Sequence, residues 1–176
     1  MSALNGFLES AVRSATPLAY AAAGELVAER SGVINLGLEG SLACGAFAAF
    51  IVAGALGPET GFVAGAAAGA LVALFFAFFV LIVRAQQIIA GTATTMLGLG
   101  ISATLHRSLS MRPGSVEHVA TLAPVKLPLL GDIPVIGSAL FAQSVATYAL
   151  YLVFPVLAWM LYRTTGGLAL RATGER

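Results

Sequence analysis

One carboxylate stands inside an otherwise apolar stretch of this chain, and it is the ionisable group best placed to do chemistry. Glu39 lies in residues 33–56, which contain no other Asp, Glu, Lys or Arg. A charged side chain within a bilayer costs about 2.5–3.5 kcal/mol on insertion scales unless it is paired or hydrated. Two interpretations stay open. Glu39 stabilises a helix N-terminus or pairs with Arg30 near the membrane interface, or it lines a path for a polar substrate.

The residues around Glu39 predict an interrupted helix. Residues 31–40 read Ser-Gly-Val-Ile-Asn-Leu-Gly-Leu-Glu-Gly, so glycines loosen the backbone at several positions. Asn35 is the expected N-cap, because its short side chain accepts hydrogen bonds from the free amides of a first helical turn. Glu39 then falls in that turn, where the helix dipole favours a negative charge.

A second group of polar residues occupies the start of residues 88–105. It combines uncharged amides and hydroxyls: Gln86, Gln87, Thr92, Thr94 and Thr95. Such groups hydrogen-bond sugars and nucleosides, but they also join helices to one another inside membranes, and packing is the favoured interpretation. The candidate residues for a substrate path are therefore Asn35, Glu39, Gln86, Gln87, Thr92 and Thr94.

Residues that would activate water or a nucleophile form no recognisable pattern in this sequence. His106 and His118 lie in or beside a long loop, Cys44 is the single cysteine, and no HExxH or GxSxG motif occurs. A phosphate-binding GxxxxGKS or GxxxxGKT motif is also missing. We therefore expect no catalytic residue, no metal and no cofactor, and an ATP-driven machine would need its nucleotide site on another chain.

The composition indicates that most of the chain is surrounded by lipid. Hydrophobic residues make up 59% of the 176 positions and charged residues 10%, against about 45–50% and about 25% in a soluble domain. Lipid-facing helices need apolar residues on all sides, which explains this excess. The net charge of +1 offers no basic surface for nucleic acid. The predicted fold is an all-α, polytopic transmembrane helix bundle with a broken second helix.

Long hydrophobic runs define the expected topology, because a membrane-spanning helix needs about 20 apolar residues. The first run is the least regular, since Glu9, Arg13 and Glu25 interrupt it and Thr16-Pro17 indicates a helix start or a kink. The expected spans are residues 4–28, 33–56, 62–83, 88–105 and 141–162.

The orientation in the membrane rests mainly on the carboxy-terminal end. Positive charges are only weakly biased between the two sides, so they decide little. Trp159 and Tyr162 form an interfacial aromatic pair directly before Arg163. We therefore place residues 163–176 in the cytoplasm and the proline-rich loop 107–140 on the extracytoplasmic side.

Three glycines at four-residue spacing, Gly61, Gly65 and Gly69, predict a close helix contact. Small residues at this spacing let helix backbones approach each other in lipid. Packing within the chain is the favoured interpretation, and a seam between two copies is the alternative.

One long motif and several short ones carry a family resemblance. The long motif is Glu-Arg-Ser-Gly-Val-Ile-Asn-Leu-Gly-Leu-Glu-Gly at residues 29–40. The short ones are Thr16-Pro17-Leu18 with Gly24-Glu25, then Gln87-Ile88-Ile89-Ala90-Gly91, residues 127–134 and the tail 162–175. Over nearly its whole length the chain resembles the permeases of ABC importers related to the branched-chain amino acid, ribose and nucleoside systems. The nucleoside or simple-sugar branch fits best.

This resemblance implies a multi-pass permease subunit of a bacterial inner-membrane importer, which forms the translocation path while separate subunits hydrolyse ATP. The implied partners are a second permease subunit, cytoplasmic ATP-binding subunits, an extracytoplasmic substrate-binding protein and the lipid bilayer. By the same resemblance, residues 163–176 start a cytoplasmic coupling segment that contacts the ATP-binding subunit. The contact residues implied are Arg171, Ala172, Gly174 and Glu175.

Two departures from the family pattern are visible. Ser41 stands where a methionine is usual, and the chain ends at Arg176, where such permeases continue. The resemblance therefore implies the amino-terminal part of one permease domain. The alternatives are an ion- or proton-coupled secondary transporter, in which intramembrane acids and broken helices also occur, and a truncated membrane subunit that does not transport.

Overall fold

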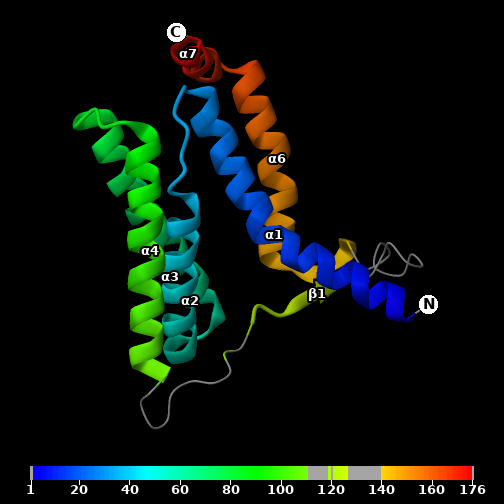
Figure 1. The fold of residues 1–176 in the computed structure, drawn as a ribbon. Coiled ribbons are helices and arrows are strands. Elements are labelled where there is room, and N and C mark those ends of the chain that lie inside the picture. The colour runs from blue at the N-terminus through cyan, green and yellow to red at the C-terminus, as the bar shows by residue number, and fades with distance from the viewer. Residues whose placement is uncertain (1, 111–118, 120, 127–139, 176) are drawn as a thin grey trace. The chain divides into compact units, whose positions relative to one another are not determined.

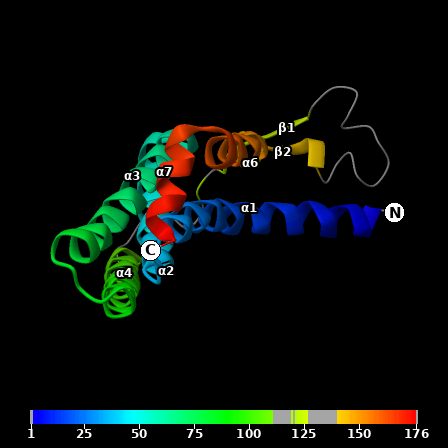
Figure 2. The same cartoon turned by 90° about the horizontal axis from the view of Figure 1, so that it is seen from above.

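The computed structural model describes residues 2–110, 119, 121–126 and 140–175, and the chain divides into two compact units. One unit is formed by Met1–Gly32 with Leu122–Arg176, and the other by Val33–Thr121. Figures 1 and 2 show the elements of both units in two perpendicular views.

The unit Val33–Thr121 is built from three long helices, α2 (Leu38–Leu56), α3 (Pro58–Ala77) and α4 (Gln87–Ser110), which lie side by side in Figure 1. A single residue, Gly57, turns the chain from α2 into α3. Its φ of +101° is a conformation that residues with a Cβ rarely adopt, and its amide closes α2 by donating to the Ala53 carbonyl at 3.0 Å. Pro58 then occupies the first position of α3, where a missing N–H costs nothing.

Helices α2 and α3 meet through small residues. A Cβ added to Gly65 would lie 2.8 Å from the Gly45 carbonyl oxygen, and one added to Gly61 would lie 2.8 Å from the Ala49 carbonyl oxygen. A Cβ added to Gly69 would lie 3.5 Å from the Ser41 carbonyl oxygen, which is an ordinary contact distance. The spaced glycines therefore pack within the chain, as the favoured interpretation predicted.

Helix α3 widens at its end into a π-helical turn, η1 (Phe78–Ile82). The Val83 amide donates to the Phe78 carbonyl at 3.2 Å, and the Ala85 amide donates to the Phe79 carbonyl at 2.9 Å. Arg84 takes the left-handed conformation between them, with φ of 59°. This wide turn ends the predicted span 62–83 and reverses the chain into α4.

The unit that contains both chain ends consists of α1 (Ser2–Arg30), α6 (Val145–Arg163), α7 (Thr165–Gly174) and two short strands. Strand β1 (Pro124–Lys126) pairs antiparallel with β2 (Ala142–Ser144), with Val125 opposite Gln143. The helix in the predicted span 141–162 begins only at Val145, because residues 142–144 form strand β2. The strands are also the exception to the all-α prediction.

Helix α1 continues through Pro17 and bends near its middle in Figure 1. Thr16-Pro17 therefore marks a kink inside the helix and not a helix start. Proline cannot donate to the carbonyl four residues earlier, which loosens the helix at this point. Thr16 bends it further by donating its hydroxyl to the Val12 carbonyl at 2.9 Å.

Polar contacts join α1 to α6 and β2. The Thr16 and Thr147 hydroxyls lie 3.2 Å apart, and the Tyr20 hydroxyl donates to the Ala146 carbonyl at 2.7 Å. Gln143 is buried and donates through its side-chain nitrogen to the Glu9 carbonyl at 3.4 Å. In an apolar environment these bonds hold the two helices in register, because each group would otherwise lack a partner.

Within the described residues, four helices are long and apolar enough to cross a membrane: Leu38–Leu56, Pro58–Ile82, Gln87–Leu109 and Val145–Arg163. They overlap the second to fifth predicted spans, and that each crosses the membrane stays a prediction. The predicted first span, residues 4–28, lies in α1 and is not among the four, so its crossing stays a prediction. The predicted start at residue 33 is wrong, because the helix begins at Leu38. Most of the predicted loop 107–140, including His118, lies outside the described residues.

Candidate functional site

The non-helical segment 33–37 lies against the first turns of α4. The Ile34 amide donates to the side-chain oxygen of Gln87 at 2.9 Å. The Thr95 hydroxyl donates to the Leu36 carbonyl at 2.7 Å. These two bonds satisfy backbone groups that no helix or strand partner serves, and they fix the non-helical segment before α2.

Asn35 organises this segment, but it is not the N-cap predicted from the sequence. The N-cap of α2 is Gly37, which makes no side-chain capping bond. The Asn35 side-chain oxygen accepts the Gly37 amide at 3.0 Å, two residues further on. Asparagine makes this local bond readily because its amide is short, and the resulting turn displaces the helix start to Leu38.

Close backbone approach joins the start of α2 to α4. A Cβ on Gly40 would lie 2.6 Å from the Thr94 carbonyl oxygen, and one on Gly98 would lie 2.6 Å from Gly40 Cα. A Cβ on Gly91 would lie 2.7 Å from Leu36 Cβ. No side chain fits at these positions, so the glycines determine how near the two helices lie. The sequence analysis took Gly40 and Gly91 as parts of family motifs and did not predict that they, or Gly98, lie at a helix contact.

The candidate residues on α4 separate into two groups. Thr94 is buried at 3% exposure and donates its hydroxyl to the Ala90 carbonyl of its own helix at 2.7 Å, so it packs. Thr92 is exposed, and its hydroxyl is shared between the Ile88 and Ile89 carbonyls at 3.0 and 3.1 Å. Gln86 is also exposed, and its carbonyl accepts the first α4 amide bond, from Ala90 at 3.0 Å.

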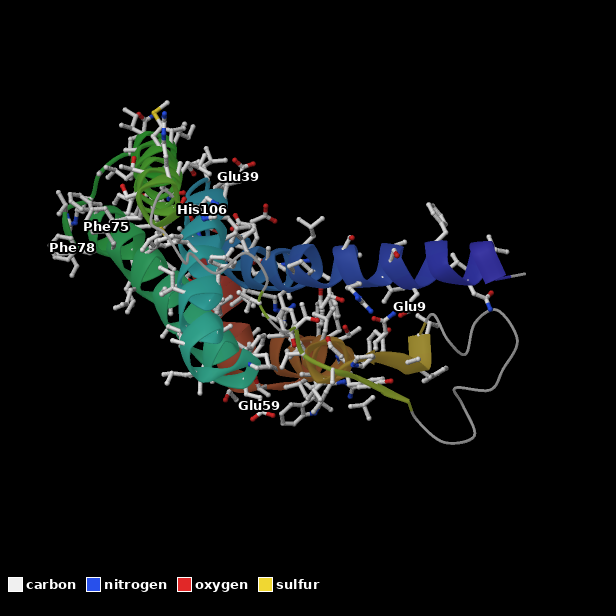
Figure 3. All side chains as sticks on the ribbon, turned by 90° about the horizontal axis from the view of Figure 1, so that it is seen from below. Glu9, Glu39, Glu59, Phe75, Phe78 and His106 are labelled. Carbon is white, nitrogen blue, oxygen red and sulfur yellow. The ribbon has the colours of Figure 1, made fainter. Side chains whose placement is uncertain are left out.

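Glu39 lies in the first turn of α2 and is exposed. Figure 3 shows its side chain directed outward from the helix. Within its own unit it forms no ion pair with a described residue. Arg30 belongs to the other unit, where its guanidinium contacts Tyr162. The position of Glu39 agrees with stabilisation of the helix N-terminus, and it leaves the carboxylate accessible.

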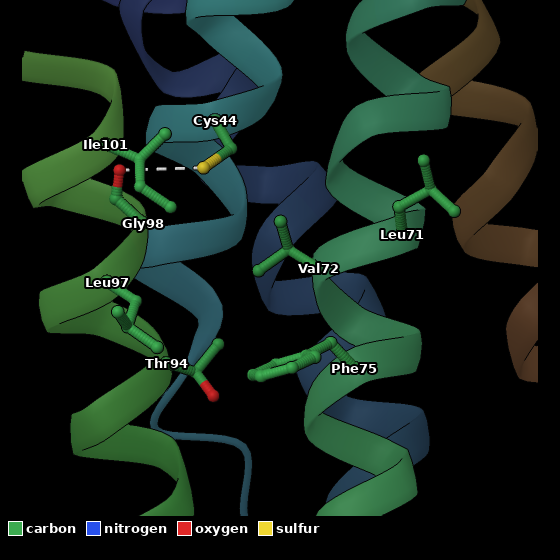
Figure 4. Close-up of a pocket in the computed structure, with 8 residues that line it drawn as sticks. All are labelled: Cys44, Leu71, Val72, Phe75, Thr94, Leu97, Gly98 and Ile101. Atoms are coloured by element: carbon green, nitrogen blue, oxygen red, sulfur yellow. Dashed lines mark hydrogen bonds between the residues drawn. The ribbon is translucent and has the colours of Figure 1, made fainter. Parts of the chain in front are cut away.

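A pocket of about 260 Å³ opens between α2, α3 and α4 (Figure 4). Its walls are mainly carbon, from side chains that include Leu71, Phe75, Leu97 and Ile101. The Cys44 thiol donates to the Gly98 carbonyl at 3.5 Å on one side of it. Thr94 also lines the pocket, but its hydroxyl donates to the Ala90 carbonyl of its own helix. So apolar a lining does not suit a sugar or nucleoside, and we do not take the pocket as the candidate substrate site. Sequence reasoning did not predict it.

The segment predicted to couple the chain to the ATP-binding subunit contains the helix α7. The chain turns from α6 into α7 at Thr164, which is extended with φ of −114° and ψ of 154°. The Thr164 hydroxyl caps α7 by accepting the Gly167 amide at 3.1 Å. Gly167 is buried, and a Cβ added there would lie 2.6 Å from the Leu161 carbonyl oxygen. Its small size therefore allows α7 to pack against the end of α6.

The four predicted contact residues lie in the last turn of α7 and directly after it. Arg171 stacks on the Tyr162 ring with its Cζ 5.2 Å from the ring centroid. Ala172 and Glu175 are exposed, and the Glu175 amide donates to the Arg171 carbonyl at 3.1 Å. Gly174 approaches the end of α1, where a Cβ would lie 2.5 Å from the Arg30 carbonyl oxygen. Gly174 is exposed as well but lies against the end of α1, whereas for Ala172 and Glu175 no side-chain contact is described.

Within residues 2–110, 119, 121–126 and 140–175, no group of three or more His, Cys, Asp or Glu side chains could hold a metal ion. The polar groups of the candidate site are instead amides, hydroxyls and one carboxylate at the start of α2 and α4. Within the described residues, four helices long and apolar enough to cross a membrane define a polytopic helical membrane protein.

Comparison with known protein families identifies the family of this chain. Residues 7–176 match the model of the branched-chain amino acid transport system permease component, and the chain belongs to this family. No solved structure matches it.

Three curated relatives are similar over most of the chain. A provisionally assigned glucose ABC transporter permease protein of Haloferax volcanii is 36% identical over 181 residues, which cover 99% of this chain. A guanosine ABC transporter permease protein of Bacillus subtilis is 34% identical and covers 92%, and a nucleoside ABC transporter permease protein of Lactococcus lactis is 32% identical and covers 91%. The chain spans 53% of the length of each relative, about half.

Proposed function

We propose that this chain forms part of the translocation path of an ATP-driven importer for a nucleoside or a simple sugar. The observation that carries the proposal is the non-helical segment 33–37, whose backbone is hydrogen-bonded to Gln87 and Thr95 of α4, in a chain that belongs to a family of transporter permeases. Relatives named for guanosine, nucleosides and glucose support neutral, hydroxyl-rich substrates. Uncharged amides and hydroxyls suit such substrates, because they exchange hydrogen bonds without a strong charge.

The candidate residues differ in whether their side chains make contacts within the chain or are exposed, and we assign their roles on that basis. Asn35, Gln87 and Thr94 make intrachain contacts that shape the site, so we assign them a positioning role. Glu39, Gln86 and Thr92 are exposed near the starts of α2 and α4, and we assign them to the path itself.

The proposal includes the rest of the machine. A second permease subunit completes the path, cytoplasmic ATP-binding subunits hydrolyse ATP, and an extracytoplasmic substrate-binding protein delivers the substrate. The setting is a bacterial inner membrane. Residues 163–176 contact the ATP-binding subunit through the exposed Ala172 and Glu175.

Transport by proteoliposomes tests this function. The complete permease, reconstituted with its cognate ATP-binding and substrate-binding proteins, should take up radiolabelled guanosine or glucose only when hydrolysable ATP is supplied to the ATP-binding subunits. A non-hydrolysable ATP analogue is the control. Uptake that persists without ATP and collapses with a protonophore would establish the alternative, an ion- or proton-coupled transporter.

A further inference from the structure

The end of α1 and the end of α7 touch through their backbones. A Cβ on Gly174 would lie 2.5 Å from the Arg30 carbonyl oxygen and 2.9 Å from the Gly32 amide nitrogen. In the other direction, a Cβ on Gly32 would lie 3.1 Å from Gly174 Cα. Both positions are glycine, and no larger residue fits without moving one of the two chain segments.

The α1 side of this contact is itself well defined. Ser31 donates its amide and its hydroxyl to the Ala28 carbonyl at 3.0 and 2.7 Å. The Gly32 amide donates to the Glu29 carbonyl at 3.0 Å, and Gly32 has φ of +85°. These bonds close the helix with a glycine in a conformation that other residues rarely adopt. The surface presented to Gly174 is therefore a fixed helix end.

One aromatic ring joins the same two helices to α6. The Arg171 Cζ lies 5.2 Å and the Arg30 Cζ 6.0 Å from the Tyr162 ring centroid. Arg30 also donates to the Tyr162 hydroxyl at 3.3 Å. A guanidinium within about 6 Å of an aromatic centroid is attracted to the ring, so Tyr162 holds a cation from each helix.

The start of α7 is tied to α6 by Thr164. Its hydroxyl donates to the Met160 carbonyl at 2.5 Å and accepts the Gly167 amide at 3.1 Å. Both ends of α7 are therefore held, the first by α6 and the last by α1, and Figure 2 shows α7 extending from one to the other.

We infer that Tyr162, Gly32 and Gly174 are positioning residues that lock α7 to the end of α1, so that α7 and the last turns of α1 move as one body. A ten-residue helix is too short to be stable alone in water, and this contact supplies the missing support. Where α7 receives movement from an ATP-binding subunit, a consequence that rests on the proposed function, the movement passes directly to α1.

Hydrogen exchange on the chain in lipid nanodiscs tests the lock without any partner. Gly174→Ala should raise the exchange rate of the α7 amides by about tenfold or more, because the added methyl displaces the α1 end. Gly166→Ala is the matched control, since a Cβ there meets only the Thr164 hydroxyl at 3.9 Å. It should leave α7 exchange unchanged.

A second pair of variants separates the lock from general misfolding. Tyr162→Leu should raise α7 exchange several-fold, while Tyr162→Phe, which keeps the ring, should stay within about twofold of the parent. Exchange in α2 and α3 should remain unchanged in all four variants. Parental α7 exchange in both Gly174→Ala and Tyr162→Leu would overturn the inference. This readout requires no transport, so its failure would leave the proposed importer function standing, and a failed transport assay would leave the lock standing.

Discussion

The Ile34 amide and the Gln87 side-chain oxygen are 2.9 Å apart, although 53 residues separate them in the chain. This bond fastens the segment before α2 to the first residue of α4, and it places the long family-like motif beside the polar start of the next-but-one helix. Asn35 and Thr95 complete the arrangement with bonds of 3.0 and 2.7 Å. The candidate site thus depends on a contact that neither segment makes by itself.

Replacing Gln87 should loosen this segment. Gln87→Leu removes the acceptor for the Ile34 amide and should cost about 0.5–1.5 kcal/mol, since the bond is exposed. Gln87→Glu keeps an acceptor oxygen and should cost less. Thermal unfolding in detergent and amide exchange at Ile34 measure the two effects. Equal losses in both variants would show that the bond contributes nothing.

The approach of α2 to α4 should be sensitive at one glycine and tolerant at its neighbour. In Gly98→Ala the new methyl would lie 2.6 Å from Gly40 Cα, and overpacking of this kind costs about 1–3 kcal/mol. Gly100→Ala meets nothing within 4 Å and should be neutral or slightly stabilising, because alanine favours a helix. Denaturation midpoints of the two variants test this. A Gly100→Ala variant as unstable as Gly98→Ala would mean that backbone approach is not the cause.

Glu39 should matter more for transport than for folding. The side chain is exposed, so Glu39→Gln and Glu39→Leu should each lower stability by no more than about 1 kcal/mol, the usual contribution of a charge at a helix N-terminus. In a complete permease we expect Glu39→Leu to reduce uptake strongly, while Glu39→Gln retains more, because an amide still hydrogen-bonds. Full uptake by a well-folded Glu39→Leu variant would remove this residue from the path.

The orientation of the chain is open to cysteine labelling. After Cys44→Ala, single cysteines replace Ala123, beside β1, and Ala172, in α7, both of which are exposed. A membrane-impermeant maleimide should label position 123 in intact cells and position 172 only after permeabilisation. The reverse pattern would invert the predicted topology.

Hydrophobic length and local motifs determined much of this protein by themselves. Apolar runs long enough to cross a bilayer can be recognised in the sequence alone, without knowing what packs against them. Four spans were predicted in this way: residues 33–56, 62–83, 88–105 and 141–162. The four helices found long enough to cross follow from that property. The motif at residues 29–40 likewise indicated the family without structural information, and the match of residues 7–176 to the family model confirms that assignment.

Only the tertiary structure decided how these segments meet. Asn35 was assigned a capping role because local rules favour it, but its oxygen closes a turn on Gly37 while Gln87 holds the neighbouring amide. Residues 142–144 read as the start of a helix, yet they pair with a strand that begins 18 positions earlier in the chain. The sequence did not single out Gly98 and assigned Gly174 to a partner contact, whereas the structure places Gly98 against Gly40 and Gly174 against Arg30. Each of these outcomes depends on which distant segment supplies a hydrogen-bond partner or fills the available space, and hydrophobic length and local propensity carry no information about that choice.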